Sequence, residues 1–272
     1  MIRDNALPAL DNYIDIDPAQ AAAFRKNGHT LVKSVLSREE AAAYRPVINE
    51  AAYRFNTEKR KMEDRDTYGK AFLQIMNLWE LDEQVRKFTL AKRFAGIAAA
   101  LLGVDNVRLY HDQALYKEAG GGLTPWHQDQ YYWPLSTSNT VTMWMPLIDI
   151  NEEMGMLTFA SQSQEEGFVE NLAISDASEA LLDKHIKDRG YAVCRANTMQ
   201  AGDATWHYGW TLHNAPGNRS AVTREVMTII YFADGATVTT PKNEHQEADR
   251  QRWLCGTAPG APAASRLNPL LL

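Results

Sequence analysis

The sequence predicts a mainly β fold with flanking helices, namely an antiparallel barrel or jelly roll with helices packed on one face. Helix signals fill roughly the first hundred residues, and from Val107 onward β-branched and aromatic residues alternate in short runs. The composition, 45% hydrophobic and 23% charged over 272 residues, is typical of a globular protein. A chain of this length and composition can bury one sizeable core.

The N-terminal region carries three helix predictions and one short strand prediction. Asp17-Pro18 supplies an N-cap and a proline at the first helical position, so a helix is expected over residues 19–26. A strand is expected over 29–35. Ser37 to Glu40 form a capping box that opens an alanine-rich helix reaching about Phe55. A further helical stretch is expected over 82–102.

The rest of the chain carries the strand predictions and one inserted helix. Short alternating runs, punctuated by Gly, Pro, Asn and Asp, predict strands at 107–117, 139–148, 155–160, 197–206 and 223–233. A helix is expected at 175–188, and an irregular tail held by contacts at 256–272. We therefore expect a single domain over 1–272, divided into a helical lead (1–105), a jelly-roll core (106–235) and a C-terminal tail (236–272).

Charge and cysteine content exclude several classes of protein. The formal charge of −6 and the absence of a long Lys/Arg run leave no electrostatic footprint for nucleic acid or for an anionic membrane. The two cysteines are too few for a disulfide framework or a cysteine-built zinc site. Met1 to Asn5 lack the apolar region of a signal peptide, so a cytoplasmic protein acting on a small molecule is expected. Nothing in the sequence indicates an oligomeric state.

The segment Thr124 to Gln130 places an imidazole and a carboxylate two residues apart. On an extended segment, His127 and Asp129 would project from the same face and could bind one ion. The alternative is an ordinary surface turn, since polar pairs at this spacing are common. The pair therefore needs a third ligand from elsewhere in the chain.

That third ligand is expected to be His213. Two histidines and one carboxylate on one face of an octahedral iron leave three positions open for cosubstrate and O2. His207 is the rival, but only His213 is followed by the Asn218, Ser220 and Arg224 pattern considered below.

Arg224 opens an otherwise apolar strand, where an unpaired charge is costly. A planar guanidinium binds a carboxylate through two parallel hydrogen bonds. Arg224 is therefore expected to meet a carboxylate.

Together these features resemble the phytanoyl-CoA dioxygenase family of Fe(II)- and 2-oxoglutarate-dependent oxygenases. The resemblance is specific from Asp112 to Asp234 and looser over most of the chain. Its markers are His127-Gln128-Asp129, the strand Thr142 to Leu147, Gly155-Met156-Leu157, Gly202-Asp203, His213, Asn218, Ser220 and Arg224.

The resemblance implies a double-stranded β-helix, a cupin-like jelly roll, with Fe(II) bound by His127, Asp129 and His213. It also implies that Arg224 pairs with the C5 carboxylate of 2-oxoglutarate, and that O2 is consumed with release of succinate and CO2. Trp144 and Gln113 occupy positions that contact the cosubstrate in similar proteins. Gln113 shares a strand face with His111, Leu115 and Lys117, and this face is expected to line the cavity.

The chain departs from the family pattern at two places. Ala215 stands where similar proteins often carry a small hydroxyl residue, and residues 160–164 replace the usual Pro-Gly-Ser-His turn. Neither departure touches an iron ligand. The carboxylate of Asp129 also argues against the halogenating relatives, which leave that coordination site free for a halide.

Aromatic residues concentrate beside the expected iron ligands. Tyr131, Trp206 and Trp210 are the expected substrate contacts, and they would suit an apolar or ring-containing small molecule. The predicted reaction is an oxidation, in the simplest case a hydroxylation, in secondary metabolism. The alternatives are a phytanoyl-type acyl-CoA hydroxylase and a non-catalytic cupin-like protein that binds a metal or ligand.

Overall fold

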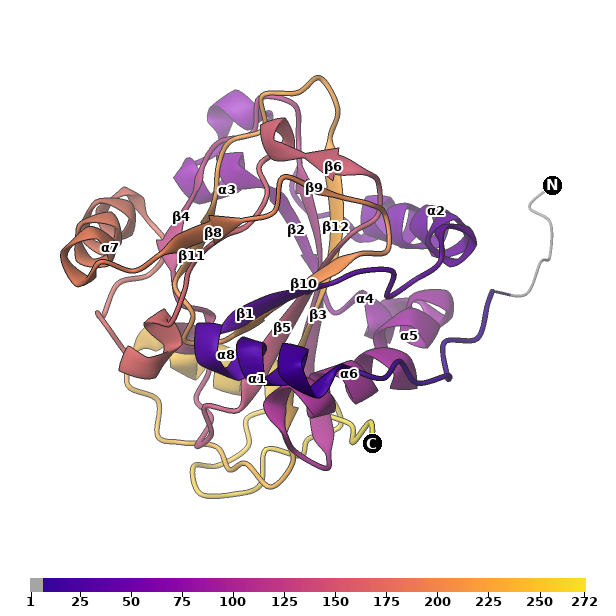
Figure 1. The fold of residues 1–272 in the computed structure, drawn as a ribbon, viewed down its shortest axis with the longest axis vertical. Helices are drawn as coiled ribbons and strands as arrows, with labels where there is room; N and C mark the ends of the chain where they lie inside the picture. The colour runs from indigo at the N-terminus through magenta and orange to yellow at the C-terminus, as the bar shows by residue number, and fades with distance from the viewer. Residues whose placement is uncertain (1–6) are drawn as a thin grey trace.

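The computed structural model describes residues 7–272, so the expectation drawn from Met1 to Asn5 lies outside the described residues. Two antiparallel sheets form the centre of the molecule (Figure 1). The larger sheet has the strand order β1-β10-β5-β12-β3-β2 and the smaller one β4-β11-β7-β8, while β6 and β9 pair separately. The expected mainly β fold with an antiparallel core is therefore confirmed.

The strands of the larger sheet are β1 (His29–Val32), β2 (Leu73–Met76), β3 (Val107–Lys117), β5 (Thr140–Pro146), β10 (Ala204–Tyr208) and β12 (Arg224–Ala233). Those of the smaller sheet are β4 (Thr124–His127), β7 (Thr158–Ala160), β8 (Val193–Arg195) and β11 (His213–Ala215), and the separate pair is β6 (Ile150–Asn151) and β9 (Thr198–Met199). The predicted run at 197–206 is thus two strands, because Gly202 adopts a left-handed turn between them. The predicted strand at 29–35 ends at Val32.

The helices are α1 (Pro18–Asn27), α2 (Arg38–Phe55), α3 (Thr67–Ala71), α4 (Leu78–Leu81), α5 (Glu83–Thr89), α6 (Lys92–Leu102), α7 (Asp176–Arg189) and α8 (Glu244–Trp253). The capping box at the start of α2 is formed, with Ser37 and Glu40 each bonding the other's backbone N–H. The inserted helix is α7, capped by Ser175.

One predicted helical stretch is two helices. The chain turns extended at Ala91, between α5 and α6, although no Pro or Gly stands there. Ala91, Phe88 and Phe94 are all buried in the main core, so packing against the sheet sets this break and local propensity does not.

The main core lies between the larger sheet and the helices α2, α4, α5 and α6, which gather beside it in Figure 1. Alternate residues of β5 and β12, such as Met143, Met145, Met227 and Ile229, are fully buried there. The opposite face of the sheet points toward the smaller sheet, and a second, smaller apolar cluster beneath α7 closes the other side. The space between the two sheets therefore has walls on both sides.

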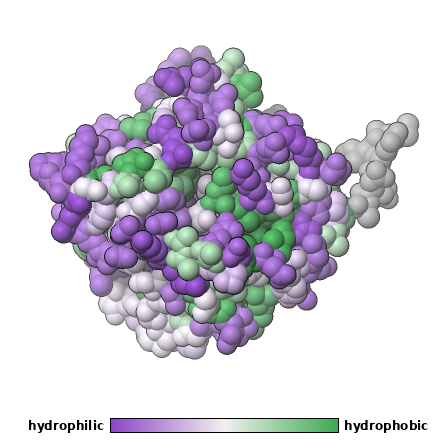
Figure 2. All heavy atoms as spheres, viewed as in Figure 1, coloured by the Kyte–Doolittle hydropathy of each residue, from purple (hydrophilic) through white to green (hydrophobic). Residues whose placement is uncertain are grey.

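The C-terminal region differs from the prediction. Residues 236–272 are not all tail, because α8 forms within them. Beyond α8 the chain is largely irregular as expected, and Leu267 anchors it in the main core. Among residues 7–272, no helix combines the length and apolar character needed to cross a bilayer. On the face shown in Figure 2, hydrophilic residues cover most of the surface, with smaller hydrophobic patches between them.

Candidate active site

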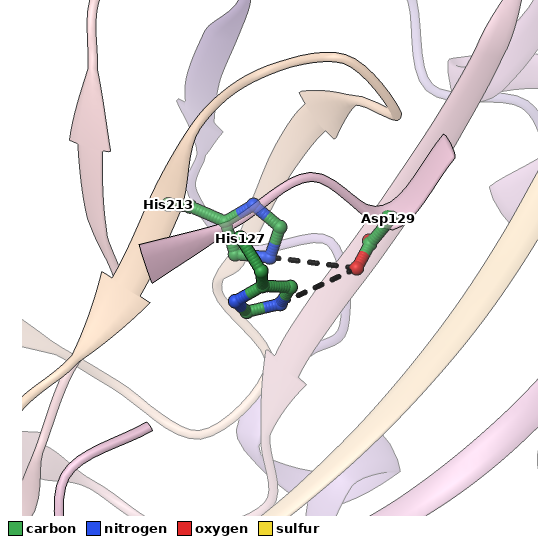
Figure 3. Close-up of side chains that lie close together, drawn as sticks. All are labelled: His127, Asp129 and His213. Carbon is green, nitrogen blue, oxygen red and sulfur yellow. Dashed lines mark ion pairs between the residues drawn. The ribbon is translucent and has the colours of Figure 1, made fainter. Parts of the chain in front are cut away.

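Two neighbouring strands and a tight turn bring the predicted triad together. His213 on β11 is paired directly with His127 on β4, so their rings lie side by side with centroids 4.1 Å apart. Asp129 begins the 3-10 turn η2 (Asp129–Tyr132), which directs its carboxylate back toward both rings (Figure 3). The Asp129 Oδ1 atom lies 3.5 Å from His127 Nε2 and 3.6 Å from His213 Nε2. One ligand atom from each residue falls within 4.8 Å of the others.

The hydrogen bonds of the two rings decide which nitrogens carry lone pairs. His127 Nδ1 lies 2.7 Å from the carbonyl oxygen of Pro125, and His213 Nδ1 lies 2.9 Å from that of Thr211. A carbonyl only accepts, so each Nδ1 carries the proton and each Nε2 presents a lone pair. Burial and the neighbouring histidines also hold the pKa of His213 well below its usual value. Two lone pairs therefore face a carboxylate oxygen at distances too long for hydrogen bonds, an arrangement that a cation stabilises.

The second carboxylate oxygen of Asp129 is held from the opposite side. Thr142 Oγ1 donates to Oδ2 at 3.0 Å, and His207 Nε2 lies 3.2 Å from the same atom. Burial acts to raise the pKa of this carboxyl, but the surrounding histidines outweigh it and hold the pKa well below its usual range. His207, the rival for third ligand, thus contacts the carboxylate from behind and lies outside the three-residue cluster.

Arg224 is a buried cation that forms no ion pair with the described carboxylates. Its side chain is 2% exposed, its Nε has no hydrogen-bond partner, and burial lowers its pKa to about 9. Lys117 is paired with it across the strands and is fully buried, so a second basic side chain lies nearby. An anion entering the cavity would relieve this uncompensated charge.

The structure explains why a glycine, Gly155, precedes Met156-Leu157. The carbonyl oxygen of Gly155 accepts a hydrogen bond from Arg224 Nη1. Its backbone is left-handed, with a φ of +74°, and an added Cβ would lie 2.3 Å from the carbonyl oxygen of Pro216. Only glycine fits this position, and its carbonyl fixes one edge of the guanidinium.

The triad and Arg224 line one cavity of about 430 Å³ between the two sheets. Trp144 and Gln113 line it too, and the Arg224 guanidinium lies 5.1 Å from the centre of the Trp144 ring. Gln113 accepts a 2.8 Å hydrogen bond from Gln74. The remaining wall is mostly aromatic and aliphatic, including Tyr68, Phe72, Met76, Leu115, Tyr132, Trp133, Leu157, Ile174, Ile230 and Trp253.

The expected face of β3 is the one that lines the cavity. His111, Gln113 and Leu115 all border it, whereas Asp112 and its alternate neighbours face away. Lys117, at the end of the same face, is buried beneath the wall and contacts Thr124 Oγ1 at 3.2 Å. Alternation grouped these residues on one face, and the family resemblance indicated that this face lines the cavity.

The three expected substrate contacts are not among the residues that border the cavity. Trp206 is fully buried in the main core, because it pairs with Met143 and shares that residue's face of the sheet. Tyr131 packs against Tyr132 and His245, and Trp210 is edge-on to Phe168 at 6.2 Å. Because successive side chains of a strand point to opposite faces, His207 faces the cavity and its neighbour Trp206 faces the core.

Several cavity residues were not assigned a role from the sequence. His111 lines the cavity as expected for its strand face, but no role followed for it from the sequence. Asp249 and Trp253 come from α8, a helix without a signal in the sequence because its ten residues are mostly polar and show no apolar face. Tyr132 also borders the cavity, and its hydroxyl accepts a 3.0 Å hydrogen bond from Ile174 N.

The hydroxyl missing at Ala215 has a counterpart on the neighbouring strand. Ala215 on β11 is paired with Thr124 on β4, and both border the cavity. The Thr124 side chain therefore places a hydroxyl beside the position where the family pattern expects one.

Solved structures with the same fold include several iron enzymes. One is the non-haem alpha-ketoglutarate-dependent carbocyclase SnoK from nogalamycin biosynthesis, which is 24% identical, with a TM-score of 0.78 over 95% of this chain and 97% of that chain. Another is the epimerase SnoN from the same biosynthesis, which is 23% identical, with a TM-score of 0.75 over 94% of this chain and 100% of that chain. EctD from S. alaskensis, solved with 2-oxoglutarate and 5-hydroxyectoine, is 18% identical with a TM-score of 0.65 over 86% and 83%. At these identities the likeness establishes the fold alone, a double-stranded β-helix. A search of curated proteins finds no match.

The sequence itself matches a family model, that of phytanoyl-CoA dioxygenase, over residues 24–226. This range holds the triad and Arg224 and extends over about three quarters of the 272 residues. The chain therefore belongs to the phytanoyl-CoA dioxygenase family of Fe(II)- and 2-oxoglutarate-dependent oxygenases.

Proposed function

We propose that His127, Asp129 and His213 hold the ferrous ion, that Arg224 binds the distal carboxylate of 2-oxoglutarate, and that the substrate is an apolar or ring-containing small molecule. The observation that carries the metal assignment is the facing of two imidazole lone pairs and one carboxylate oxygen with no proton between them. The unpaired charge of Arg224 on the same cavity supports the cosubstrate assignment.

When bound, iron and 2-oxoglutarate together activate O2, release succinate and CO2, and supply the oxidant. The residues of the chain prepare that chemistry. Thr142 and His207 fix the second oxygen of Asp129, so its first oxygen is oriented toward the two rings. Arg224, Trp144 and Gln113 orient the keto acid, and Thr124 offers a hydroxyl in place of the one missing at Ala215.

The walls of the cavity support the proposed class of substrate. Aromatic and aliphatic side chains dominate the wall, and they bind apolar rings by burial while excluding water from the reacting atoms. Among the described residues that line the wall, Arg224 and Arg252 contribute a full positive charge, so a phosphate-rich acyl-CoA gains little electrostatic attraction there. We therefore place a small-molecule oxidation, in the setting of secondary metabolism, ahead of acyl-CoA hydroxylation.

The test is anaerobic loading of the purified protein with Fe(II) and 2-oxoglutarate. A weak visible charge-transfer band is expected for the wild-type chain. His213→Ala should lower iron affinity on the order of a hundredfold or more and lose the band. The matched control is His185→Ala, which removes a histidine that pairs with Glu166 outside the cavity and should leave the band intact.

A folded wild-type protein without the band would refute the proposed metal and cosubstrate site. Equal bands in both histidine variants would refute the ligand assignment. Under aerobic conditions, screening ring-containing metabolites for stimulated succinate release tests the substrate class, and CoA binding in a calorimeter would favour the acyl-CoA alternative.

A further inference from the structure

A β-bulge in β3 creates an unusual stretch of cavity wall. In the pairing of β12 with β3, Ile230 stands opposite His111 and Tyr231 opposite Leu109, so Tyr110 has no partner. An extra residue reverses the alternation of a strand and re-aims its side chains. Leu109 faces the main core, whereas His111 borders the cavity and its ring centroid lies 5.0 Å from that of Tyr110. The bulge therefore brings two consecutive aromatic rings together beside the cavity.

His111 is a buried polar side chain with an unsatisfied ring nitrogen. It is 2% exposed, it borders the cavity, and its Nδ1 has no hydrogen-bond partner among the described residues. Burial lowers its pKa to about 3, so the ring is neutral at working pH and carries one donor and one acceptor nitrogen. Buried polar atoms are rarely left unsatisfied, and those that are need an explanation such as a ligand.

The opposite side of this wall comes from α8. Asp249 borders the cavity, and its Oδ2 accepts a 2.9 Å hydrogen bond from the Tyr110 hydroxyl. Trp253, one helical turn later, has its ring centroid 5.3 Å from that of His111. The bulged strand and the helix are thus joined by one hydrogen bond and one ring contact, and they present an imidazole and a carboxylate to the same space.

This subsite lies away from the proposed cosubstrate anchor. Arg224 is paired with Lys117, six residues along β3 from His111, which corresponds to roughly 20 Å of strand. Asp129 borders the same cavity on the His111 side, because its partner Thr142 stands opposite Ile230, which in turn stands opposite His111. A molecule bound at the His111 end would therefore extend toward the metal-binding triad.

We propose that His111 and Asp249 form a substrate subsite that binds a neutral hydroxyl group, an alcohol or a phenol, on an otherwise apolar ring system. The proposal rests on the proposed function and names the substrate class more closely. The hydroxyl forms one hydrogen bond with the Asp249 carboxyl group and a second with the neutral His111 ring, so both its donor and its acceptor are used.

The ionisable groups around the subsite favour a neutral hydroxyl group. Burial raises the pKa of Asp249 to about 7, so its carboxyl group can accept a hydrogen bond in the charged form or donate one in the neutral form. A carboxylate or phosphate would be repelled by the charged form. A hydroxyl group, which both donates and accepts, fits either form of Asp249 and the neutral imidazole of His111.

The test compares 2-naphthol with naphthalene, two bicyclic probes that differ only in the hydroxyl group. Binding to the metal-free full-length protein is followed by quenching of tryptophan fluorescence. The wild-type chain should bind 2-naphthol on the order of tenfold more tightly than naphthalene. Asp249→Leu and His111→Phe, which keep side-chain size but remove the polar atoms, should each lower that ratio to about one. Glu247→Gln, on the same helix but outside the cavity wall, should leave the ratio unchanged.

Two variants at separate elements keep the test decisive if one of them fails to fold. The proposal is overturned if wild-type protein does not prefer 2-naphthol, including the case in which it binds neither probe, or if a folded variant retains the full preference. The anaerobic band with Fe(II) and 2-oxoglutarate is measured on the same proteins. Its presence with no naphthol preference refutes the subsite alone, and its absence with an intact preference refutes the proposed function alone.

Discussion

The two faces of the central sheet are built from the same strands but to opposite rules. On the helix-covered face, Met143, Met227 and Ile229 are fully buried and apolar, and every neighbour is protein. On the cavity face, Thr142 donates a hydrogen bond to Asp129 of the triad, and the Nε atom of Arg224 has no hydrogen-bond partner among the described residues. The helix-covered face stabilises the fold, whereas the cavity face carries polar groups that lower the stability of the ligand-free protein.

Arg224→Met should separate the two properties most strongly. Methionine removes a buried charge that pairs with none of the described carboxylates, so the free energy of unfolding should stay the same or rise. Loss of two charge-assisted hydrogen bonds to the cosubstrate, each contributing about 1.5–3 kcal/mol, should weaken 2-oxoglutarate binding on the order of 10²- to 10⁴-fold. Calorimetric titration with 2-oxoglutarate and a urea melt measure the two effects.

The matched control removes an arginine of α2, Arg45, whose partner is the next residue of β12. Arg45→Met removes a partly exposed ion pair with Glu225, which follows Arg224 in β12. It should change the stability by at most about 1 kcal/mol and leave 2-oxoglutarate binding unchanged. A large loss of stability in Arg224→Met, with cosubstrate binding intact, would show that the arginine is structural and would remove the contrast between the faces.

Neighbouring isoleucines in β12 test the contrast with no change of charge. Ile229 is fully buried in the main core, so Ile229→Ala should lower the free energy of unfolding by about 2–5 kcal/mol. Ile230→Ala removes the same atoms on the cavity side, where empty space already borders the side chain, and should cost clearly less. Urea melts of both variants measure the free energy of unfolding, and equal losses in the two variants would contradict the contrast between the faces.

The same contrast explains how far the sequence could predict this protein. Alternation grouped His111 and Gln113 on one face of β3, and the family resemblance indicated that this face lines the cavity. The predicted bounds of this strand, 107–117, are those of β3. The triad followed from its spacing and from the family pattern. These features depend on residue type and order alone.

Other features depend on packing that no local pattern encodes. The helical break at Ala91 follows from burial against the sheet, and α8 has a mostly polar surface that hides its role as a cavity wall. The bulge at Tyr110 leaves no mark in the sequence, yet it places Leu109 and His111 on opposite faces of the sheet. Trp206 was assigned to substrate by proximity to His213, although the register with β5 turns it into the core.

The smallest expected effect concerns Asp112, the one carboxylate on the core face of β3. Its side chain is fully buried and accepts hydrogen bonds from Leu78 N, Trp79 N and Thr89 Oγ1, so it fastens α4 and α5 to the sheet. Asp112→Asn keeps the shape but weakens these acceptors and should lower the free energy of unfolding by about 1–3 kcal/mol.

The stability lost in Asp112→Asn should depend on pH. Burial, which outweighs the hydrogen bonds, raises the pKa of Asp112 from its usual 3.8 to about 6 in the folded protein. The folded state therefore holds this proton more tightly than the unfolded state, and the resulting stability is fully present below pH 3.8 and is lost as the pH rises through about 6. Asparagine lacks this titration, so the stability lost on substitution should be greater at pH 5 than at pH 7.5. Paired urea melts at the two pH values measure the difference. A loss that is the same at both would mean that Asp112 keeps its charge when buried, and that the core face tolerates a charge as the cavity face does.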